Sequence, residues 1–249
     1  MTGAPMGASA GAPNGTAGPV GDLVRANRIL AREGVLDADG HVSARLAGAG
    51  GGFLLSRSRA AELVEAGDLV AHGPDGEAVG GCEWPLFLER HLHAAIYARR
   101  AEVGAICHAH TPSILSFGVA ETPLRAVIHS ARFLGTAVPV WDLARELPGE
   151  ASPLVDNPVD AASLAERLDG NAVVLLRGHG CVVVGRDPQE VVARCLAMDR
   201  NARVQLVAQR LGEYVSLHEG ECEDLSTPAP PLSADNRAWE YLCRRAGVE

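Results

Sequence analysis

The amino-acid sequence predicts one α/β domain in which helices sandwich a mixed or mainly antiparallel sheet. Two observations support this fold class. Short β-like segments alternate with helical ones along most of the 249 residues, which favours a layered α/β arrangement. Several strands are also separated only by short turns, such as Gly48 to Gly52 and Pro74-Asp75-Gly76, and connections this short join antiparallel neighbours. Hydrophobic residues make up 47% of the chain, enough to bury a sizeable core.

The elements follow a Gly-, Ala- and Pro-rich segment, residues 1–18, whose composition is typical of a disordered tail. Strand patterns occupy residues 41–47, 53–56, 69–73, 103–108, 138–141, 172–176 and 181–184. Helical patterns occupy residues 21–34, 59–65, 86–100, 160–168, 188–211 and 238–245. Another helix is expected to begin at Thr111-Pro112, and Asp187 is expected to cap the helix that starts at Pro188. We therefore expect a single domain over 19–249, with a C-terminal extension from about 227 that begins as a loop over 227–231.

Composition excludes several classes of function. The chain has 22 basic residues against 31 acidic ones, a formal net charge of -9, so neither nucleic acid nor an anionic membrane is an expected partner. All the basic residues are Arg. Without Lys the chain cannot be a Schiff-base aldolase, a pyridoxal-phosphate enzyme or a Walker A NTPase. Aromatic residues make up only 4%, which argues against a stacking platform for single strands.

The cellular setting is inferred from what the sequence lacks. Its six cysteines form no Cys-x-x-Cys pair, so we expect reduced thiols rather than a disulfide framework. No apolar run reaches the ~18 residues that a membrane span needs. No basic residue precedes Arg25, so the N-terminus does not resemble a signal peptide. These features predict a cytoplasmic protein.

Three histidines have the pattern of a metal site. His108 and His110 lie two residues apart at the end of a predicted strand, so both imidazoles point to the same face. His179 is flanked by Gly178 and Gly180, which allow the backbone to approach a site closely. Three neutral histidines leave at least one coordination position open, which is the catalytic arrangement. Cys107 is expected to face away from His108 and to pack in the core.

Glu89 lies four residues before His93 on the same face of a predicted helix. Its spacing leaves two roles open. One is a surface ion pair with Arg90 or Arg99, and the other is an acid/base carboxylate beside the metal. His91 is a second candidate for proton transfer because it lies close to Glu89 in sequence.

The order of these motifs resembles the class II aldolase/adducin family. The resemblance covers about residues 20 to 215 and rests on four segments: Gly40-His41-Val42-Ser43-Ala44-Arg45, Glu89-(x3)-His93-(x3)-Tyr97, Val103 to His110, and Leu175-Leu176-Arg177-Gly178-His179-Gly180. It implies a three-layer α/β/α class II aldolase-like fold with a central, mainly antiparallel sheet. It also implies a homo-oligomer, often a tetramer, with active sites near subunit contacts. By this resemblance His108, His110 and His179 bind one divalent metal ion, and Glu89 is the acid/base carboxylate.

Departures from the family pattern concern the substrate. Phosphate-binding aldolases carry Ser-Ser before the Glu, whereas this chain has Phe87-Leu88. Their Thr-Pro-Ser-Gly loop is replaced by Ser56-Arg57-Ser58-Arg59, and the signature Asn is His41. A site with fewer hydroxyls, one or two arginines and apolar walls suits a flat carboxylated substrate, since Arg binds carboxylate bidentately.

Together with Arg237-Ala238-Trp239-Glu240-Tyr241, these departures resemble a decarboxylase branch that acts on hydroxylated aromatic or muconic-semialdehyde carboxylates. The expected substrate-binding residues are Ser56, Arg57, Ser58, Arg59, His41, His129, Trp239 and Tyr241. His129 is included because it precedes the strand over 138–141, and a core or surface role for it is left open.

The expected reaction is therefore a metal-dependent decarboxylation of a small-molecule carboxylate. Loss of CO2 beside a carbonyl or phenol leaves an enolate-like anion, which Zn, Mn, Fe or Co can stabilise as a Lewis acid. Arg57 or Arg59 would hold a second carboxylate, and Glu89 or His91 would deliver the proton. Three alternatives stay open: an aldolase or epimerase on a sugar or sugar phosphate, an iron-dependent oxygenase, and a non-catalytic adducin-like assembly module. The metal-binding histidines, which adducin relatives typically lack, count against the last of these.

Overall fold

The computed structural model describes residues 18–48, 51–146, 149, 154–222 and 237–249. The tail expected over 1–18 lies outside these residues except for Gly18, and the loop expected over 227–231 lies outside them as well. In the described part of the chain, no helix has both the length and the apolar character that crossing a bilayer requires.

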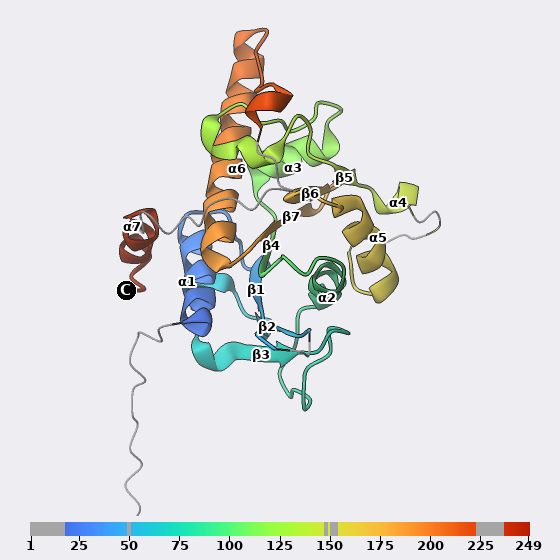
Figure 1. The fold of residues 1–249 in the computed structure, drawn as a ribbon, viewed down its shortest axis with the longest axis vertical. Helices are drawn as coiled ribbons and strands as arrows, with labels where there is room; N and C mark the ends of the chain where they lie inside the picture. The colour runs from blue at the N-terminus through green and yellow to red at the C-terminus, as the bar shows by residue number, and fades with distance from the viewer. Residues whose placement is uncertain (1–17, 49–50, 147–148, 150–153, 223–236) are drawn as a thin grey trace, which may run out of the picture.

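A central sheet of seven strands organises the molecule (Figure 1). The strands are β1 (His41–Arg45), β2 (Phe53–Ser56), β3 (Leu69–His72), β4 (Ala105–Ala109), β5 (Val140–Trp141), β6 (Val173–Leu176) and β7 (Gly180–Gly185). Their spatial order is β3-β2-β1-β4-β7-β6-β5. Every neighbouring pair is antiparallel except β5 and β6, which are parallel. The expected mainly antiparallel sheet is therefore confirmed.

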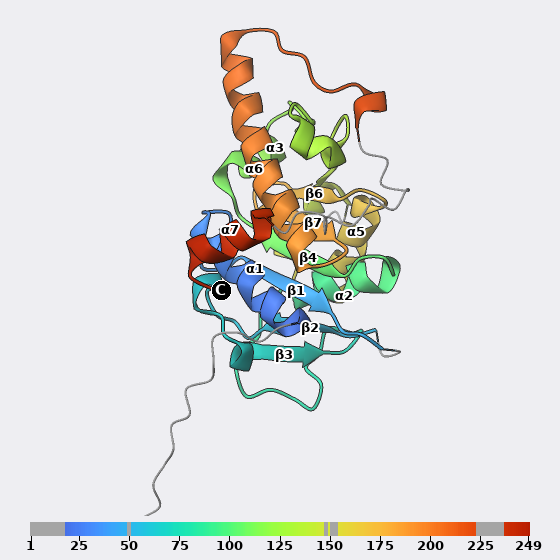
Figure 2. The ribbon, with the colours of Figure 1, turned by 60° about the vertical axis from the view of Figure 1, so that its left-hand side comes forward.

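Helices cover both faces of this sheet, so the fold has three layers. The helices are α1 (Pro19–Arg32), α2 (Arg90–Arg99), α3 (Pro112–Val119), α4 (Leu143–Glu146), α5 (Pro158–Leu168), α6 (Pro188–Leu211) and α7 (Arg237–Ala246). α1, α3 and α6 pack on one face, while α2 and α5 pack against each other on the opposite face. α7 lies along α1 (Figure 2). Short 3-10 turns occupy Ala61–Leu63, Ala66–Asp68, His129–Leu134 and Glu219–Glu221.

Successive side chains of β4 point to opposite faces of the sheet and so belong to two different hydrophobic cores. Ala105, Cys107 and Ala109 join the core under α1 and α6, whereas Ile106 joins the core under α2 and α5. His108 has the same strand parity as Ile106, so its imidazole lies on the α2 side. The expected core position of Cys107 is confirmed, and all six cysteines are free thiols.

Three expected elements differ in detail from the structure. The helix expected over 86–100 begins only at Arg90, because Glu89 occupies the N-cap position and the residues before it are irregular. The helix expected over 59–65 is only the 3-10 turn Ala61–Leu63. α3 does begin at Pro112, but Thr111 Oγ1 donates to the carbonyl oxygen of Val35 at 2.9 Å instead of capping the helix. By contrast, Asp187 caps α6 as expected, accepting from the backbone N–H of Glu190.

Arg45 fixes the end of α2 that lies away from Glu89. Its guanidinium donates to three backbone oxygens, those of Tyr97 (2.9 Å), Arg100 (2.7 Å) and Val103 (2.7 Å). It also lies over the ring of Tyr97, 4.6 Å from the centroid. The Tyr97 carbonyl lies in the last turn of α2, where no further backbone N–H of the helix reaches it, and Arg100 is the C-cap residue, whose carbonyl also accepts from the backbone N–H of Val103. The arginine therefore joins β1 to α2.

Replacing Arg45 with Lys should destabilise the fold. Lys keeps the charge but cannot present the planar fork of donors, so buried carbonyls lose their partners. We expect the free energy of unfolding to fall by roughly 1–3 kcal/mol, measured by urea denaturation. Arg203→Lys is the matched control, since Arg203 forms an exposed pair with Asp199 one turn away on α6. An equal loss in both variants would contradict a special role for Arg45.

Candidate metal centre

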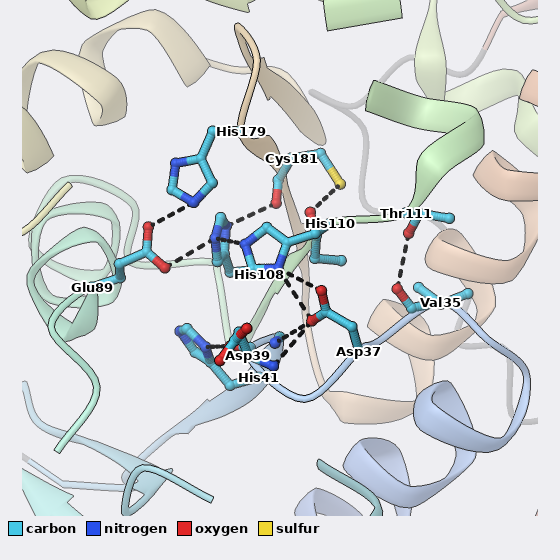
Figure 3. A network of polar contacts seen from close by, with 12 residues as sticks. Val35, Asp37, Asp39, His41, Glu89, His108, His110, Thr111, His179 and Cys181 are labelled. Atoms are coloured by element: carbon cyan, nitrogen blue, oxygen red, sulfur yellow. Dashed lines mark hydrogen bonds and ion pairs between the residues drawn. The ribbon is translucent and has the colours of Figure 1, made fainter. Parts of the chain in front are cut away.

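Four side chains from separate elements converge at one end of β4 (Figure 3). Glu89 stands at the start of α2, His108 lies in β4, His110 follows that strand, and His179 lies in the turn between β6 and β7. One ligand atom from each lies within 4.8 Å of the others. Sequence reasoning selected these same four residues, and the structure brings them together.

The carboxylate of Glu89 lies between two of the imidazoles. Oε2 is 3.1 Å from Nε2 of His108, and Oε1 is 3.3 Å from Nε2 of His179. Nε2 of His108 is also 3.0 Å from Nε2 of His110. Glu89 is 7% exposed and His108 is fully buried, so this cluster is largely shielded from water.

Hydrogen bonds on the far side of two imidazoles orient their lone pairs. Nδ1 of His108 lies 3.1 Å from the carbonyl oxygen of Cys181, and Nδ1 of His110 lies 3.1 and 3.2 Å from the two carboxylate oxygens of Asp37. These partners only accept hydrogen bonds, so each Nδ1 carries the hydrogen and each neutral ring has its lone pair on Nε2. Two lone pairs and a carboxylate oxygen therefore face one another at about hydrogen-bond distance. That donor set fits a divalent cation.

Charge in the cluster is strongly coupled. Burial alone raises the pKa of Glu89, but the neighbouring imidazoles of His108, His41 and His179 favour its anion and lower the pKa to about 2. Burial lowers the pKa of His108, yet the Glu89 carboxylate outweighs this and holds the pKa above its ordinary value. The site is therefore built to hold a carboxylate anion beside a positive charge.

Two glycines shape the turn that carries His179. Gly178 has φ +70, a conformation that side chains with a Cβ rarely adopt. A Cβ on Gly180 would lie 2.4 Å from the carbonyl oxygen of Ala109 and 2.9 Å from the ring of His110. β7 can therefore approach the end of β4 only with glycine at position 180. This agrees with the expectation that the glycines beside His179 let the backbone approach the site closely.

His41 lies directly beside the cluster. It is fully buried, its ring stacks on Phe87 at 4.2 Å between centroids, and it is 5.5 Å from the ring of His108. Nδ1 lies 3.1 Å from the carbonyl oxygen of Asp39 and so carries the hydrogen, while Nε2 has no hydrogen-bond partner among the described residues. Burial lowers the pKa of His41 to about 4, so the ring is neutral. His41 therefore presents a buried acceptor nitrogen.

The segment 56–59 lies at the end of β2, where it is held to neighbouring loops. Nε of Arg57 and Nη1 of Arg59 both contact Oδ1 of Asp68, at 2.8 and 3.0 Å. Ser56 is buried, whereas Ser58 is exposed and its backbone N–H donates to the carbonyl oxygen of Pro85. One carboxylate thus holds two guanidinium groups, leaving this pair of arginines with a net positive charge.

Four other expected site residues lie away from the cluster in this chain. His91 faces the turn after β3, with Nε2 4.0 Å from Glu77, because residues two apart on a helix do not share a face. His129 is exposed at the start of the 3-10 turn that packs against α6. Trp239 and Tyr241 belong to α7, which lies along α1. The structure gives none of the four a contact with Glu89 or the three histidines.

Sequence reasoning did not foresee several contacts around the cluster. Asp37 orients His110, although the two are 73 residues apart. Beneath the site, Oγ of Ser43 lies 2.7 Å from Nδ1 of His93 and 2.8 Å from the hydroxyl of Tyr97. Asp37 carries no motif of its own in the sequence, so nothing identified it as a partner for a distant histidine.

Comparison with known proteins gives the cluster a family context. A family model described as the Class II Aldolase and Adducin N-terminal domain matches residues 21–206. The decarboxylase TropJ of Talaromyces stipitatus is 31% identical over 214 residues, covering 81% of this chain and 80% of that protein. The 3,4-dihydroxyphthalate decarboxylase of Arthrobacter keyseri is 28% identical over 241 residues, covering 90% of this chain and 92% of that protein.

A solved structure agrees with this family at the level of the fold. The aldolase II superfamily protein from Pseudomonas syringae superposes with a TM-score of 0.75 at 20% identity, covering 92% of this chain and 91% of that one. The family model matches most of the sequence, and the sheet and helices match those of a superfamily member. The resemblance seen in the sequence motifs is confirmed: this chain belongs to the class II aldolase and adducin family.

Proposed function

We propose that this protein is a metal-dependent decarboxylase that acts on a hydroxylated aromatic carboxylate. The observation that carries the proposal is the convergence of the buried Glu89 carboxylate with His108, His110 and His179. Decarboxylases among the relatives support the choice of reaction. The same cluster favours an enzyme over a non-catalytic assembly module, since nothing in such a module calls for converging lone pairs.

His108, His110 and His179 would hold the cation through nitrogen, with Glu89 beside them. When bound, a divalent cation supplies Lewis-acid stabilisation of the negative charge that develops on a substrate oxygen as CO2 leaves. The Cys181 carbonyl and Asp37 keep two of the histidines in the required tautomer. Low exposure of the site excludes water, which strengthens each of these electrostatic interactions.

Glu89 is placed to move the proton. Its carboxylate is ionised at neutral pH, so it can first accept the proton of a substrate hydroxyl. Cleavage of the carbon–carboxylate bond releases CO2 and leaves the electron pair on the substrate. Glu89 then returns the proton to that carbon, so the substrate exchanges CO2 for hydrogen without net oxidation or reduction. His91 is left out of this scheme because its side chain faces Glu77.

The surroundings of the cluster support a flat, carboxylated substrate. Phe87 and His41 form a stacked pair where phosphate-binding relatives have hydroxyl groups before the Glu, so the wall is apolar. Nε2 of His41 is a buried acceptor suited to a phenolic hydroxyl. Away from these contacts, Arg57 and Arg59 share the single carboxylate of Asp68, and we propose that their net positive charge binds a second carboxylate of the substrate.

The metal requirement can be measured first. We expect protein purified without chelator to carry about one equivalent of a divalent transition metal per chain, by elemental mass spectrometry. His110→Ala should retain less than about a tenth of this, because a ligand is lost. His129→Ala is the matched control, since that exposed histidine lies on the α6 side, and its metal content should equal that of the wild type. A wild-type chain that takes up none of Zn, Mn, Co or anaerobic Fe(II) would overturn the proposal.

The role of Glu89 predicts a large kinetic defect. Glu89→Gln should lower kcat for CO2 release at least about 100-fold, because Gln cannot carry a proton between hydroxyl and carbon. Release would be assayed on a panel of hydroxylated aromatic carboxylates that includes 3,4-dihydroxyphthalate. Glu77→Gln, which changes an exposed carboxylate near His91, should stay within about twofold. Turnover of the Glu89 variant within about tenfold of wild type would remove Glu89 as the main proton carrier.

A further inference from the structure

An ion pair ties the turn that carries His179 to the neighbouring strand. β5 and β6 run parallel, and Trp141 and Leu176 form their last register pair. The next residue on each strand is Asp142 and Arg177, and Nε of Arg177 contacts Oδ2 of Asp142 at 2.8 Å. The backbone N–H of Arg177 also donates to the carbonyl oxygen of Trp141 at 2.9 Å. One backbone hydrogen bond and one side-chain ion pair therefore extend the pairing of β5 with β6 into the turn.

The turn itself is short. Leu176 and Gly180 face each other in the β6–β7 register, so only Arg177, Gly178 and His179 form the loop. Gly178 adopts φ +70, and glycine visits many other conformations at low cost. The backbone N–H of His179 donates to the carbonyl oxygen of Leu176 at 3.1 Å. This hydrogen bond closes the loop, but it does not by itself set the orientation of the loop relative to the sheet. Among the contacts of the described residues, the Arg177 side chain is the one that ties this loop to the residue after β5.

Asp142 is unusual as an anchor. It is buried, and its Oδ1 has no hydrogen-bond partner among the described residues, while Oδ2 contacts Arg177 and, at 3.3 Å, Arg145. A buried carboxylate with an unpaired oxygen is costly, so losing an arginine partner would leave the charge of Asp142 with less compensation. Arg145 is 86% exposed and adds little. Arg177 is half-exposed, but its contact with the buried carboxylate is the shorter of the two and is the one that links Asp142 to the turn.

We propose that Asp142 is a positioning residue for the metal centre: through Arg177 it sets the orientation of the turn, and thereby the place of the His179 imidazole opposite Glu89. This inference rests on the proposed metal site but not on the identity of the reaction. Asp142 touches neither the four clustered side chains nor the reacting atoms. Groups that orient metal ligands in this indirect way typically change metal affinity by 10- to 100-fold.

Metal affinity separates this role from a purely structural one. We would measure the Kd for Zn(II) by competition with a chromophoric chelator, and the melting temperature of the metal-free protein. Asp142→Asn keeps the shape of the side chain but removes its charge. We expect the Kd to rise about 10- to 100-fold while the metal-free melting temperature stays within about 2 °C of wild type.

Three further variants, one of them a control, make the experiment decisive. Arg177→Ala removes the other half of the ion pair at a half-exposed position, so it tests the inference even where Asp142→Asn folds poorly, and it should raise the Kd to a similar extent. Arg177→Lys should restore part of the affinity because the positive charge returns. Arg145→Ala is the matched control: it removes the exposed partner of the same carboxylate oxygen and should leave the Kd unchanged.

Each outcome has a clear meaning. Unchanged Zn(II) affinity in both Asp142→Asn and Arg177→Ala, or a lowered metal-free melting temperature with unchanged affinity, would overturn the positioning role alone. Weakened affinity in these variants, together with a wild type that releases CO2 from no substrate on the panel, would support the positioning role and contradict the decarboxylase. A wild type that binds no metal would overturn both.

Discussion

The burial of the Glu89 carboxylate among imidazoles is the constraint on which the rest of the site depends. A buried anion is unfavourable unless positive or hydrogen-bonding groups surround it. Here those groups come from β4, from the residue after it and from the β6–β7 turn, so three parts of the sheet must meet the start of α2 at one point. The lowered pKa of Glu89 and the raised pKa of His108 are two expressions of this same coupling.

Support for the cluster comes from residues that do not belong to it. The carbonyl oxygen of Cys181 orients His108, and the carboxylate of Asp37 orients His110. Cys181 lies in β7 and Asp37 lies between α1 and β1, so each is far in sequence from the histidine that it contacts. Glycine at position 180 lets β7 lie close enough to β4 for this to happen. The cluster is thus a product of strand pairing as much as of its own side chains, which is why an antiparallel sheet with a sharp β6–β7 turn can carry it.

Local patterns predicted the sheet, the layers and the three histidines, because strand alternation and glycine flanking act over a few residues. Glu89 was assigned beside them only through the resemblance to the family, since its spacing left two roles open. His108 and Cys107 were assigned to opposite faces on parity alone. Contacts between distant segments were beyond such reasoning. The pairing of Asp37 with His110, and of Arg57 and Arg59 with Asp68, depends on how loops meet in space. The start of α2 was misplaced because the apolar residues before Glu89 continue a helical pattern, although Phe87 instead stacks on His41.

The two ends of α2 are fixed independently, and this has a consequence for how the pocket can diversify. Arg45 holds the last turn of the helix to β1, while Glu89 at the first turn is held by the histidines. The irregular segment just before Glu89 carries Phe87, whose carbonyl oxygen accepts from Arg90 and whose ring stacks on His41. A change of the Phe87 side chain would alter what lies against His41, while Glu89 keeps its contacts with the histidines. The apolar side chain beside the cluster and the carboxylate within it can accordingly evolve, or be engineered, separately.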